Sequence, residues 1–290
     1  MATLHIIGNG FDIYHEIASS YWDFYQYLKE NGHSSFIDQM ETFFPNKNKQ
    51  GKNLLWSDFE KALGNINIED TFQYCTEDIE IDYDHMMRST AQIEDAPTYV
   101  LGDMFTEMHT RFEEWIKSID IDVQKEHLAE FDYDGLFFTF NYTDTIESVY
   151  GIPKDKVFHI HGSRIAGDDL IVGHCNYINP HSIGNEDTVL YEDASKSNIA
   201  ELANQEMKSV ESIISSNSSY WYTLNKINKV VVYGHSLSDV DLPYLKTIKA
   251  NVDTLSEWHF SWYSNEDINR IKQLINKLNL LQSNCFTFKM

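Results

Sequence analysis

The stretch Thr3-Leu4-His5-Ile6-Ile7-Gly8-Asn9-Gly10-Phe11-Asp12 decides the fold class of this chain. Its apolar first half is typical of a buried β-strand, and the glycines that follow predict a tight turn where the strand ends. Three further apolar runs end in polar clusters, which are Phe140-Asn141-Tyr142-Thr143, His159-Ile160-His161-Gly162 and Gly234-His235-Ser236-Leu237-Ser238-Asp239. Because open α/β sheets bind ligands beyond the carboxyl ends of their strands, the four clusters predict one converged site.

Strand and helix patterns alternate near the N-terminus and again from Gly135 onward. This alternation predicts an α/β fold with a Rossmann-like, mainly parallel sheet and helices on both faces. We expect residues 1–32 and 130–290 to form this core, and residues 33–129 to form a helical insertion. The expected strands are 3–7, 136–140, 157–160, 170–172, 229–233, 259–263 and 285–288, and the expected helices are 20–30, 36–44, 56–63, 97–119, 144–150, 198–216, 242–250 and 265–278.

The chain is strongly acidic, with 45 acidic and 22 basic residues and a formal net charge of −23. Such a surface repels phosphate backbones and anionic lipids, so we expect neither broad nucleic-acid binding nor membrane binding. No apolar run approaches the ~18 residues of a membrane span. Cys75, Cys175 and Cys285 lie far apart without a C-x-x-C pair, which argues against a cysteine zinc site and fits a reducing compartment, here the cytoplasm.

Gly8 and Gly10 form half of a dinucleotide-binding fingerprint, because glycine lets the backbone turn tightly and approach a phosphate. Ile13 stands where the third glycine of that fingerprint belongs, and a plain tight turn explains the glycine pair as well. Asp12 would repel phosphates, so we expect it to face a ribose or the reacting bond.

Asn141 and His161 are the strand-end side chains best suited to catalysis. An amide both donates and accepts hydrogen bonds, so Asn141 could orient a water or a ribose hydroxyl, or only satisfy the local turn. A histidine can act as a general base near neutral pH, and Gly162 lets a ligand approach His161. His159, expected to point to the same side as His161, and His174 are further candidates.

The turn Gly234-His235-Ser236 follows a valine-rich strand pattern and precedes a helix. Its backbone amides and the Ser236 hydroxyl suit a phosphate or a ribose. Capping of the next helix by Ser238 or Asp239 explains the same residues without any ligand.

The opening I-I-G-N-G-F-D, with the S-Y-W-D-F that follows, resembles the start of the abortive-infection protein H (AbiH) family of bacterial phage-defence proteins. The later order F-N-Y-T, H-I-H-G and G-H-S-L-S-D is similar to that of sirtuin-like NAD-binding domains, over about residues 3–30 and 135–242. Thr143 stands where those domains carry an acidic residue, and Asp144 comes one place later. The zinc module of deacetylating sirtuins is missing, which argues against protein deacetylation.

The resemblance implies that Asn141 holds the ribose or a water and that His161 is the catalytic histidine, and we add Asp12 as a source of negative potential. The activity implied is hydrolysis of the nicotinamide–ribose bond, with NAD as the substrate and no metal or other cofactor. The residues expected to contact the dinucleotide are Gly8, Asn9, Gly10, Phe11, Gly234, His235 and Ser236.

Two other functions fit the same motifs. A metal-dependent phosphoesterase or nuclease could use Asp12, Asn9, His161, His174 and His235, because such side chains bind divalent metals. A non-catalytic protein could instead sense a nucleotide and pass the signal through the helical insertion to a partner. For any effector of this kind we expect a phage-derived trigger or partner protein and a homo-oligomer.

Overall fold

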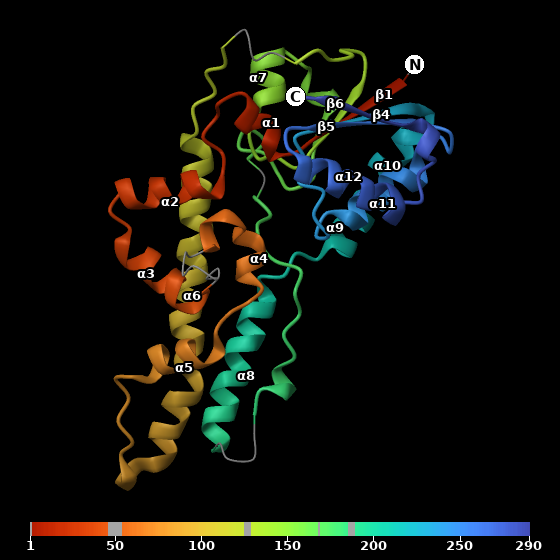
Figure 1. Cartoon of the computed structure of the whole chain (residues 1–290). Helices are drawn as coiled ribbons and strands as arrows, with labels where there is room; N and C mark the ends of the chain where they lie inside the picture. The colour runs from red at the N-terminus through yellow and green to blue at the C-terminus, as the bar shows by residue number, and fades with distance from the viewer. Residues whose placement is uncertain (1, 46–53, 125–128, 168, 185–188) are drawn as a thin grey trace. The chain divides into compact units, whose positions relative to one another are not determined.

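The computed structural model of the chain describes residues 2–45, 54–124, 129–167, 169–184 and 189–290. Its described residues contain one open sheet of six parallel strands in the order β3-β2-β1-β4-β5-β6 (Figure 1). This is the strand order of a Rossmann fold, so the predicted α/β class is confirmed. The strands are β1 Ala2–Ile7, β2 Leu136–Thr139, β3 Val157–His159, β4 Ile227–Tyr233, β5 Glu257–Trp262 and β6 Cys285–Lys289.

The two faces of the sheet pack against different helices because successive strand residues point to opposite sides. One face carries Leu4, Val230 and Phe260 and packs against apolar residues from the helices that flank β4 and β5. The other face carries Ile7 and Phe137 and packs against short helices that follow β1 and β2. The helices of the first face are α9 Val210–Ser216, α10 Ser218–Thr223, α11 Leu242–Asn251 and α12 Asn265–Lys277, and those of the second are α1 Asn9–Tyr14 and α7 Thr145–Tyr150.

The chain divides into two compact units, which we call the sheet unit and the helical unit. The sheet unit comprises residues 1–20, 116–171 and 209–290, and the helical unit comprises residues 21–115 and 172–208. The helical unit therefore has two segments, whereas the sequence suggested the single insertion 33–129. Its helices are α2 Tyr21–Glu30, α3 Ser34–Phe43, α4 Phe59–Leu63, α5 Ile68–Thr76, α6 Met86–Ser118, whose last residues lie in the sheet unit, and α8 Leu190–Gln205.

Aromatic rings form the core of the helical unit. Phe24 of α2 lies with its ring centroid 5.1 Å from Trp115, 5.6 Å from Phe112 and 5.9 Å from Phe59. Trp56 stacks on Phe59 at 5.6 Å. The aromatic face of the helix at 20–30 is thus a packing face, as amphipathic helices usually have.

Four of the expected elements differ in the structure. The expected helix at 56–63 is a short 3₁₀ helix at Leu55–Ser57 followed by α4. α6 begins at Met86 and runs through Pro97, because burial of Ile93 and Ala96 compensates for the lost backbone donor. Residues 170–172 form no strand, and Ile171 makes one backbone hydrogen bond of 2.9 Å to His161.

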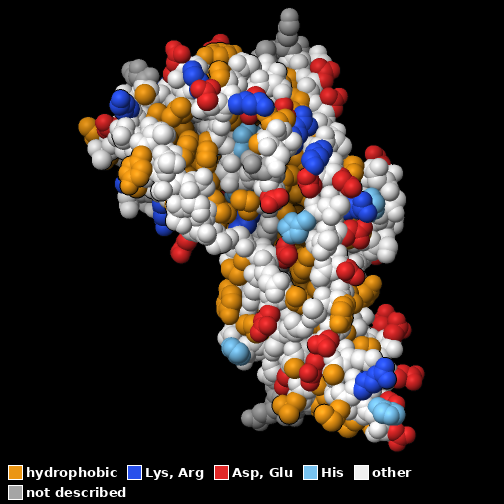
Figure 2. All heavy atoms as spheres, turned by 180° about the vertical axis from the view of Figure 1, so that it is seen from behind, with side chains coloured by type: hydrophobic (Ala, Val, Ile, Leu, Met, Phe, Trp, Pro, Cys, Tyr) orange, Lys and Arg blue, Asp and Glu red, His pale blue; other side chains and the backbone are white. Residues whose placement is uncertain are grey.

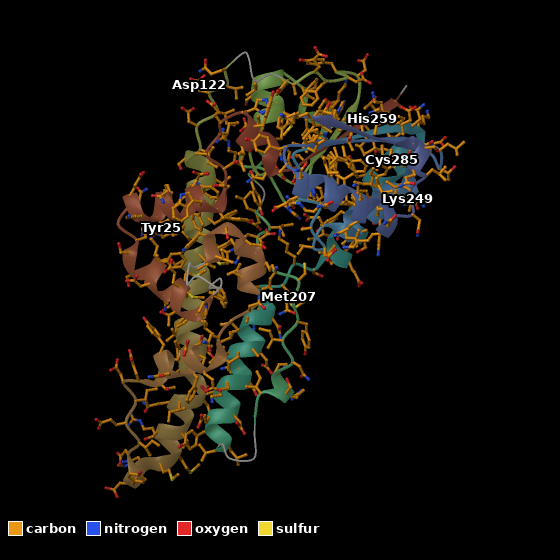
Figure 3. The ribbon with its side chains drawn as sticks, in the orientation of Figure 1. Tyr25, Asp122, Met207, Lys249, His259 and Cys285 are labelled. Carbon is orange, nitrogen blue, oxygen red and sulfur yellow. The ribbon has the colours of Figure 1, made fainter. Side chains whose placement is uncertain are left out.

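The expected helix at 198–216 is two helices, α8 and α9. α8 ends at Gln205, and Met207 follows two residues later (Figure 3). Met207 pairs with His174 in a short parallel bridge. The Lys208 amide donates to the His174 carbonyl over 2.7 Å, and a side chain at Gly173 would lie 2.2 Å from the Glu206 oxygen. This close approach interrupts the helical pattern and brings residues 172–208 into the helical unit.

The acidic residues of this chain are dispersed over its surface. In Figure 2 carboxylates are spread over the visible face, with lysines and arginines between them. Within the described part of the chain, no helix has the length and apolar character that crossing a bilayer requires.

Candidate functional site

The carboxyl ends of β1 and β4 lie side by side at the point where the strand order of the sheet reverses. Ligands of open α/β sheets bind at such a point. The Gly8 amide donates to the Tyr233 carbonyl over 2.9 Å, and the Gly10 amide donates to the Gly234 carbonyl over 2.7 Å. The structure therefore brings together the first and last of the four predicted motifs.

The glycines at this edge let the two turns interlock. A Cβ atom at Gly8 would lie 2.6 Å from His235 Cα, and one at Gly10 would lie 2.6 Å from the Gly234 oxygen. Gly234 has a left-handed backbone (φ +57°), and a Cβ atom there would lie 2.1 Å from the Phe11 nitrogen. The close approach that these glycines permit is thus between two parts of this chain.

Two residues of the first motif have structural contacts. The Asn9 side chain donates to the Ser19 carbonyl over 3.0 Å and accepts from the Ser19 hydroxyl over 2.7 Å. Phe11 is fully buried, with its ring centroid 5.7 Å from Phe131 and 5.8 Å from Tyr150. Both side chains hold the loop and helix that follow β1 in place.

Asp12 is fully buried at the start of α1. Burial raises the pKa of its carboxyl to about 6, although hydrogen bonding from Thr143, Thr145 and Asn141 favours the ionised form. The Thr143 hydroxyl donates to Oδ2 over 2.5 Å, while Oδ1 has no hydrogen-bond partner among the described residues. A buried carboxylate oxygen of this kind calls for a donor from water or a ligand.

Asn141 follows β2 and reaches the first motif. Its Nδ2 donates to the Gly8 carbonyl over 3.3 Å, and its backbone amide donates to the Thr139 hydroxyl over 3.0 Å. Its buried Oδ1 accepts no hydrogen bond within the described residues. Asp12 and Asn141 thus each present a buried oxygen acceptor at the same edge of the sheet.

His161 and His235 both contact the ring of Phe140. The His161 ring centroid lies 5.6 Å from Phe140 and 5.7 Å from Tyr244, and the His235 ring centroid lies 4.4 Å from Phe140. His161 is buried, whereas Ser236 is exposed. The second, third and fourth motifs therefore meet around one aromatic ring.

His235 stabilises the turn in which it lies. Its Nδ1 accepts a hydrogen bond of 2.8 Å from the Leu237 amide, and its Nε2 lies 3.5 Å from the Asp241 carboxylate. Burial lowers the pKa of this imidazole. The Ser238 hydroxyl donates to the Asp241 carboxylate over 3.0 Å, so local contacts maintain the turn.

The other two candidate histidines occupy different surroundings from His161. His159 Nδ1 donates to the Asn141 carbonyl over 2.9 Å, and its Nε2 lies 2.9 Å from Glu147 Oε1. The expectation that His159 and His161 share one side is wrong, because β3 ends at His159 and the chain turns at the next residue. His174 belongs to the helical unit, where its Nε2 donates to the Ala203 carbonyl over 2.8 Å.

Sequence reasoning gave no role in the site to the residues around Asp12 and Asn141, although Thr143 belongs to one of the four predicted motifs. Thr143 and Thr145 border the carboxyl of Asp12, and Glu147 orients His159 against the Asn141 backbone. Arg164 donates to the Asp144 carboxylate over 2.5 Å and to the Ile119 carbonyl. The segment T-D-T-I-E carries no local signal that pairs Thr143 with Asp12, which lies 131 residues earlier in the chain. Among the residues that the structure describes, no three His, Cys, Asp or Glu side chains gather into a group able to hold a metal.

Asp12→Asn should make the stability of the protein less dependent on pH. The pKa of the Asp12 carboxyl is 3.8 in the unfolded chain and about 6 in the folded protein, so the folded protein binds this proton more tightly. Ionisation of Asp12 therefore lowers the free energy of unfolding progressively as the pH rises from about 4 to about 6. At pH 7.5 we expect the variant to be more stable by at most about 3 kcal/mol, and near pH 4 the two proteins should be equal. Urea unfolding at several pH values measures the difference, and an equal difference at pH 4 and 7.5 would contradict the account.

One comparison with known proteins gives a match. The family model described as "Bacteriophage abortive infection AbiH" matches residues 4–262. No curated protein and no solved structure matches the chain.

Proposed function

This chain belongs to the AbiH family of bacteriophage abortive infection proteins, and on that premise we propose that it is a phage-defence effector that hydrolyses the nicotinamide–ribose bond of NAD. The single observation that supports this activity best is the pair of buried oxygens on Asp12 and Asn141 at the switch point of a Rossmann-like sheet. Dinucleotides bind at this place in such sheets.

The proposed chemistry needs a site that tolerates positive charge on the ribose. As the bond to nicotinamide breaks, its electron pair leaves with the nicotinamide and the ribose becomes cationic, as in glycoside hydrolysis. With a pKa of about 6, Asp12 is mainly ionised at pH 7.5, and its buried carboxylate would stabilise that cation strongly. This gives Asp12 an electrostatic role that requires no covalent bond.

Asn141 and His161 would handle the nucleophile. The Asn141 Oδ1 atom would accept a hydrogen bond from the attacking water or from a ribose hydroxyl. His161 would take the proton of that water or hydroxyl as a general base while the new bond to the ribose carbon forms. The ion pair of His159 with Glu147 would fix the Asn141 backbone, which makes His159 a positioning residue.

A panel of nucleotides tests the proposal. The purified protein is incubated with NAD, NADP and single nucleotides, each with EDTA or with Mn²⁺, and released bases are separated by chromatography. We expect nicotinamide and ADP-ribose from NAD in the presence of EDTA. Activity that EDTA abolishes and Mn²⁺ restores would favour the metal-dependent phosphoesterase, and nucleotide binding without turnover would favour the sensor.

The trigger and the assembly state are part of the same proposal. A free NAD hydrolase would harm its own host, so we infer that a phage-derived component or assembly into a homo-oligomer switches the activity on. The panel is therefore repeated with lysate from phage-infected cells. No release of nicotinamide in either setting would contradict the proposed activity.

A further inference from the structure

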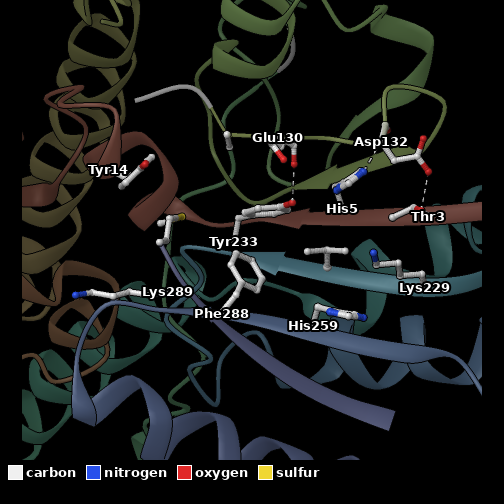
Figure 4. A pocket seen from close by; sticks show the side chains of 13 residues that line it. Thr3, His5, Tyr14, Glu130, Asp132, Lys229, Tyr233, His259, Phe288 and Lys289 are labelled. Carbon is white, nitrogen blue, oxygen red and sulfur yellow. Dashed lines mark hydrogen bonds between the residues drawn. The ribbon is translucent and has the colours of Figure 1, made fainter. Parts of the chain in front are cut away.

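A cavity lies in the sheet unit, on one face of the sheet over β1, β4, β5 and β6 (Figure 4). Its volume is about 410 Å³, within the range of small-molecule sites. Asp12, Asn141 and His161 are not among its lining residues, so it is separate from the candidate catalytic site.

His5 of β1 offers this cavity an acceptor. It is only 2 % exposed, and burial lowers its pKa to about 4, so the imidazole is neutral at pH 7. Its Nε2 lies 3.2 Å from the Asp132 carbonyl, which can only accept, so the ring proton sits on Nε2. The bare Nδ1 is buried and has no hydrogen-bond partner in the described part of the chain. Such an atom is costly to bury unless a ligand or a water donates to it.

Lys229 of β4 offers a positive charge on the same face. It stands opposite Thr3 in the strand pairing and is half-buried. Among the described residues it has no carboxylate within ion-pair distance. The second lysine of the lining, Lys289, lies 5.8 Å above the Trp262 ring.

The lining also contains two carboxylates, Glu130 and Asp132. Asp132 accepts from the Thr3 hydroxyl over 2.7 Å and from the Asp134 amide over 3.2 Å, which fixes it beside His5 (Figure 4). Both signs of charge therefore face the cavity. A phosphate group would meet repulsion from the two carboxylates, whereas a zwitterion would find a partner for each end.

Aromatic and apolar side chains form the middle of the cavity. Tyr233 of β4 and Phe288 of β6 lie edge to face with their ring centroids 5.4 Å apart. Val231 of β4 also lines the cavity and lies between Lys229 and Tyr233 along the strand. This part suits an apolar ring of about the size of a phenyl group.

We propose that this cavity binds a free α-amino acid with an aromatic side chain. The ammonium group donates to His5 Nδ1 close to Asp132, the carboxylate pairs with Lys229, and the ring packs against Tyr233 and Phe288. The site recognises all three parts of the ligand, and it needs no contribution from the NAD chemistry proposed above.

Calorimetric titration of the full chain with L-phenylalanine and its fragments tests the proposal. Phenethylamine lacks the carboxylate, 3-phenylpropionate lacks the ammonium group, and glycine lacks the ring. We expect L-phenylalanine to bind and each fragment to bind roughly 10-fold more weakly or worse, because phenethylamine and 3-phenylpropionate each lose one charge-assisted contact and glycine loses the apolar burial of the ring. Failure of L-phenylalanine to bind, or equal affinities across the series, overturns the proposal.

Variants assign the binding to this cavity. Lys229→Met should weaken L-phenylalanine roughly 10-fold or more without changing the affinity for phenethylamine. His5→Phe keeps a ring against Phe137, which lies 4.6 Å away, and should weaken the ligands that carry an ammonium group. Lys246→Met, at an exposed lysine of α11, is the matched control. Unchanged binding of L-phenylalanine by Lys229→Met, or tighter binding of AMP than of L-phenylalanine at a Lys229-dependent site, contradicts the proposal.

Discussion

His161→Gln is expected to lower the rate of NAD hydrolysis by ~10²–10⁴-fold, which is the usual contribution of a general base to the rate. Glutamine has a similar volume to histidine, so the contacts of this buried position with Phe140 and Tyr244 are largely kept. Glutamine cannot take a proton near neutral pH, and this difference should appear in turnover. The measurement is nicotinamide release per mole of enzyme at saturating NAD, with circular dichroism to show that the fold is retained.

A matched substitution separates catalysis from folding. His109→Gln makes the same change at an exposed histidine of α6, whose Nε2 lies 2.7 Å from the Glu206 carboxylate in the helical unit. We expect this control to hydrolyse NAD at the parental rate. A folded His161→Gln variant that releases nicotinamide as fast as the control would remove His161 from the mechanism.

Gly234→Ala is expected to cost more than about 4 kcal/mol of the free energy of unfolding, a loss seen only for severe structural conflicts. The added Cβ atom would lie 2.1 Å from the Phe11 nitrogen and 2.4 Å from the Gly10 carbonyl carbon. Both of these are backbone atoms of the opposing turn, so the clash can be relieved only by separating β1 and β4 at their carboxyl ends. Urea or thermal unfolding of the purified variant gives the measured loss.

Gly151→Ala is the control for this substitution. Gly151 has a similar left-handed backbone, with φ of +66°, but a Cβ atom there would meet no other atom within 4 Å. It should therefore cost only the ~1–2 kcal/mol of the left-handed conformation. Equal losses for the two variants would show that the turns do not interlock as described.

The sheet and its polar edge could be predicted from local sequence patterns. The apolar run at 3–7 and the valine-rich run at 229–233 each read as a buried strand, and in the structure they pair as β1 and β4. Glycines at the ends of these runs marked the turns. Hydrogen bonds from Asn141 and Gly10 then show that segments far apart in sequence meet at this edge.

Local sequence patterns could not predict the contacts between segments that lie far apart in the chain. The bridge of His174 with Met207 ends α8 and assigns residues 172–208 to the helical unit, although the helical pattern continues through it. Packing around Ile93 and Ala96 likewise carries α6 through Pro97, where propensity alone predicts a boundary. In both places tertiary contacts outweigh the preference of the local sequence.

The candidate site was predicted less completely than the sheet. Strand alternation suggested that His159 and His161 face the same way, but alternation holds only while the strand continues, and β3 ends at His159. The contacts of Asp12 could not be predicted from the sequence either, since the hydrogen bond that Thr143 donates to it joins residues 131 positions apart. Burial of that carboxyl, which raises its pKa, is a property of the folded chain alone.

The NAD content of cells that carry this protein, measured during infection by a phage against which it protects, tests most directly whether defence proceeds through NAD hydrolysis. We expect NAD to fall and nicotinamide to rise in cells with the parental protein, while cells with His161→Gln keep their NAD and lose protection. Protection that proceeds at constant NAD, or an equal fall of NAD with the variant, would contradict that expectation.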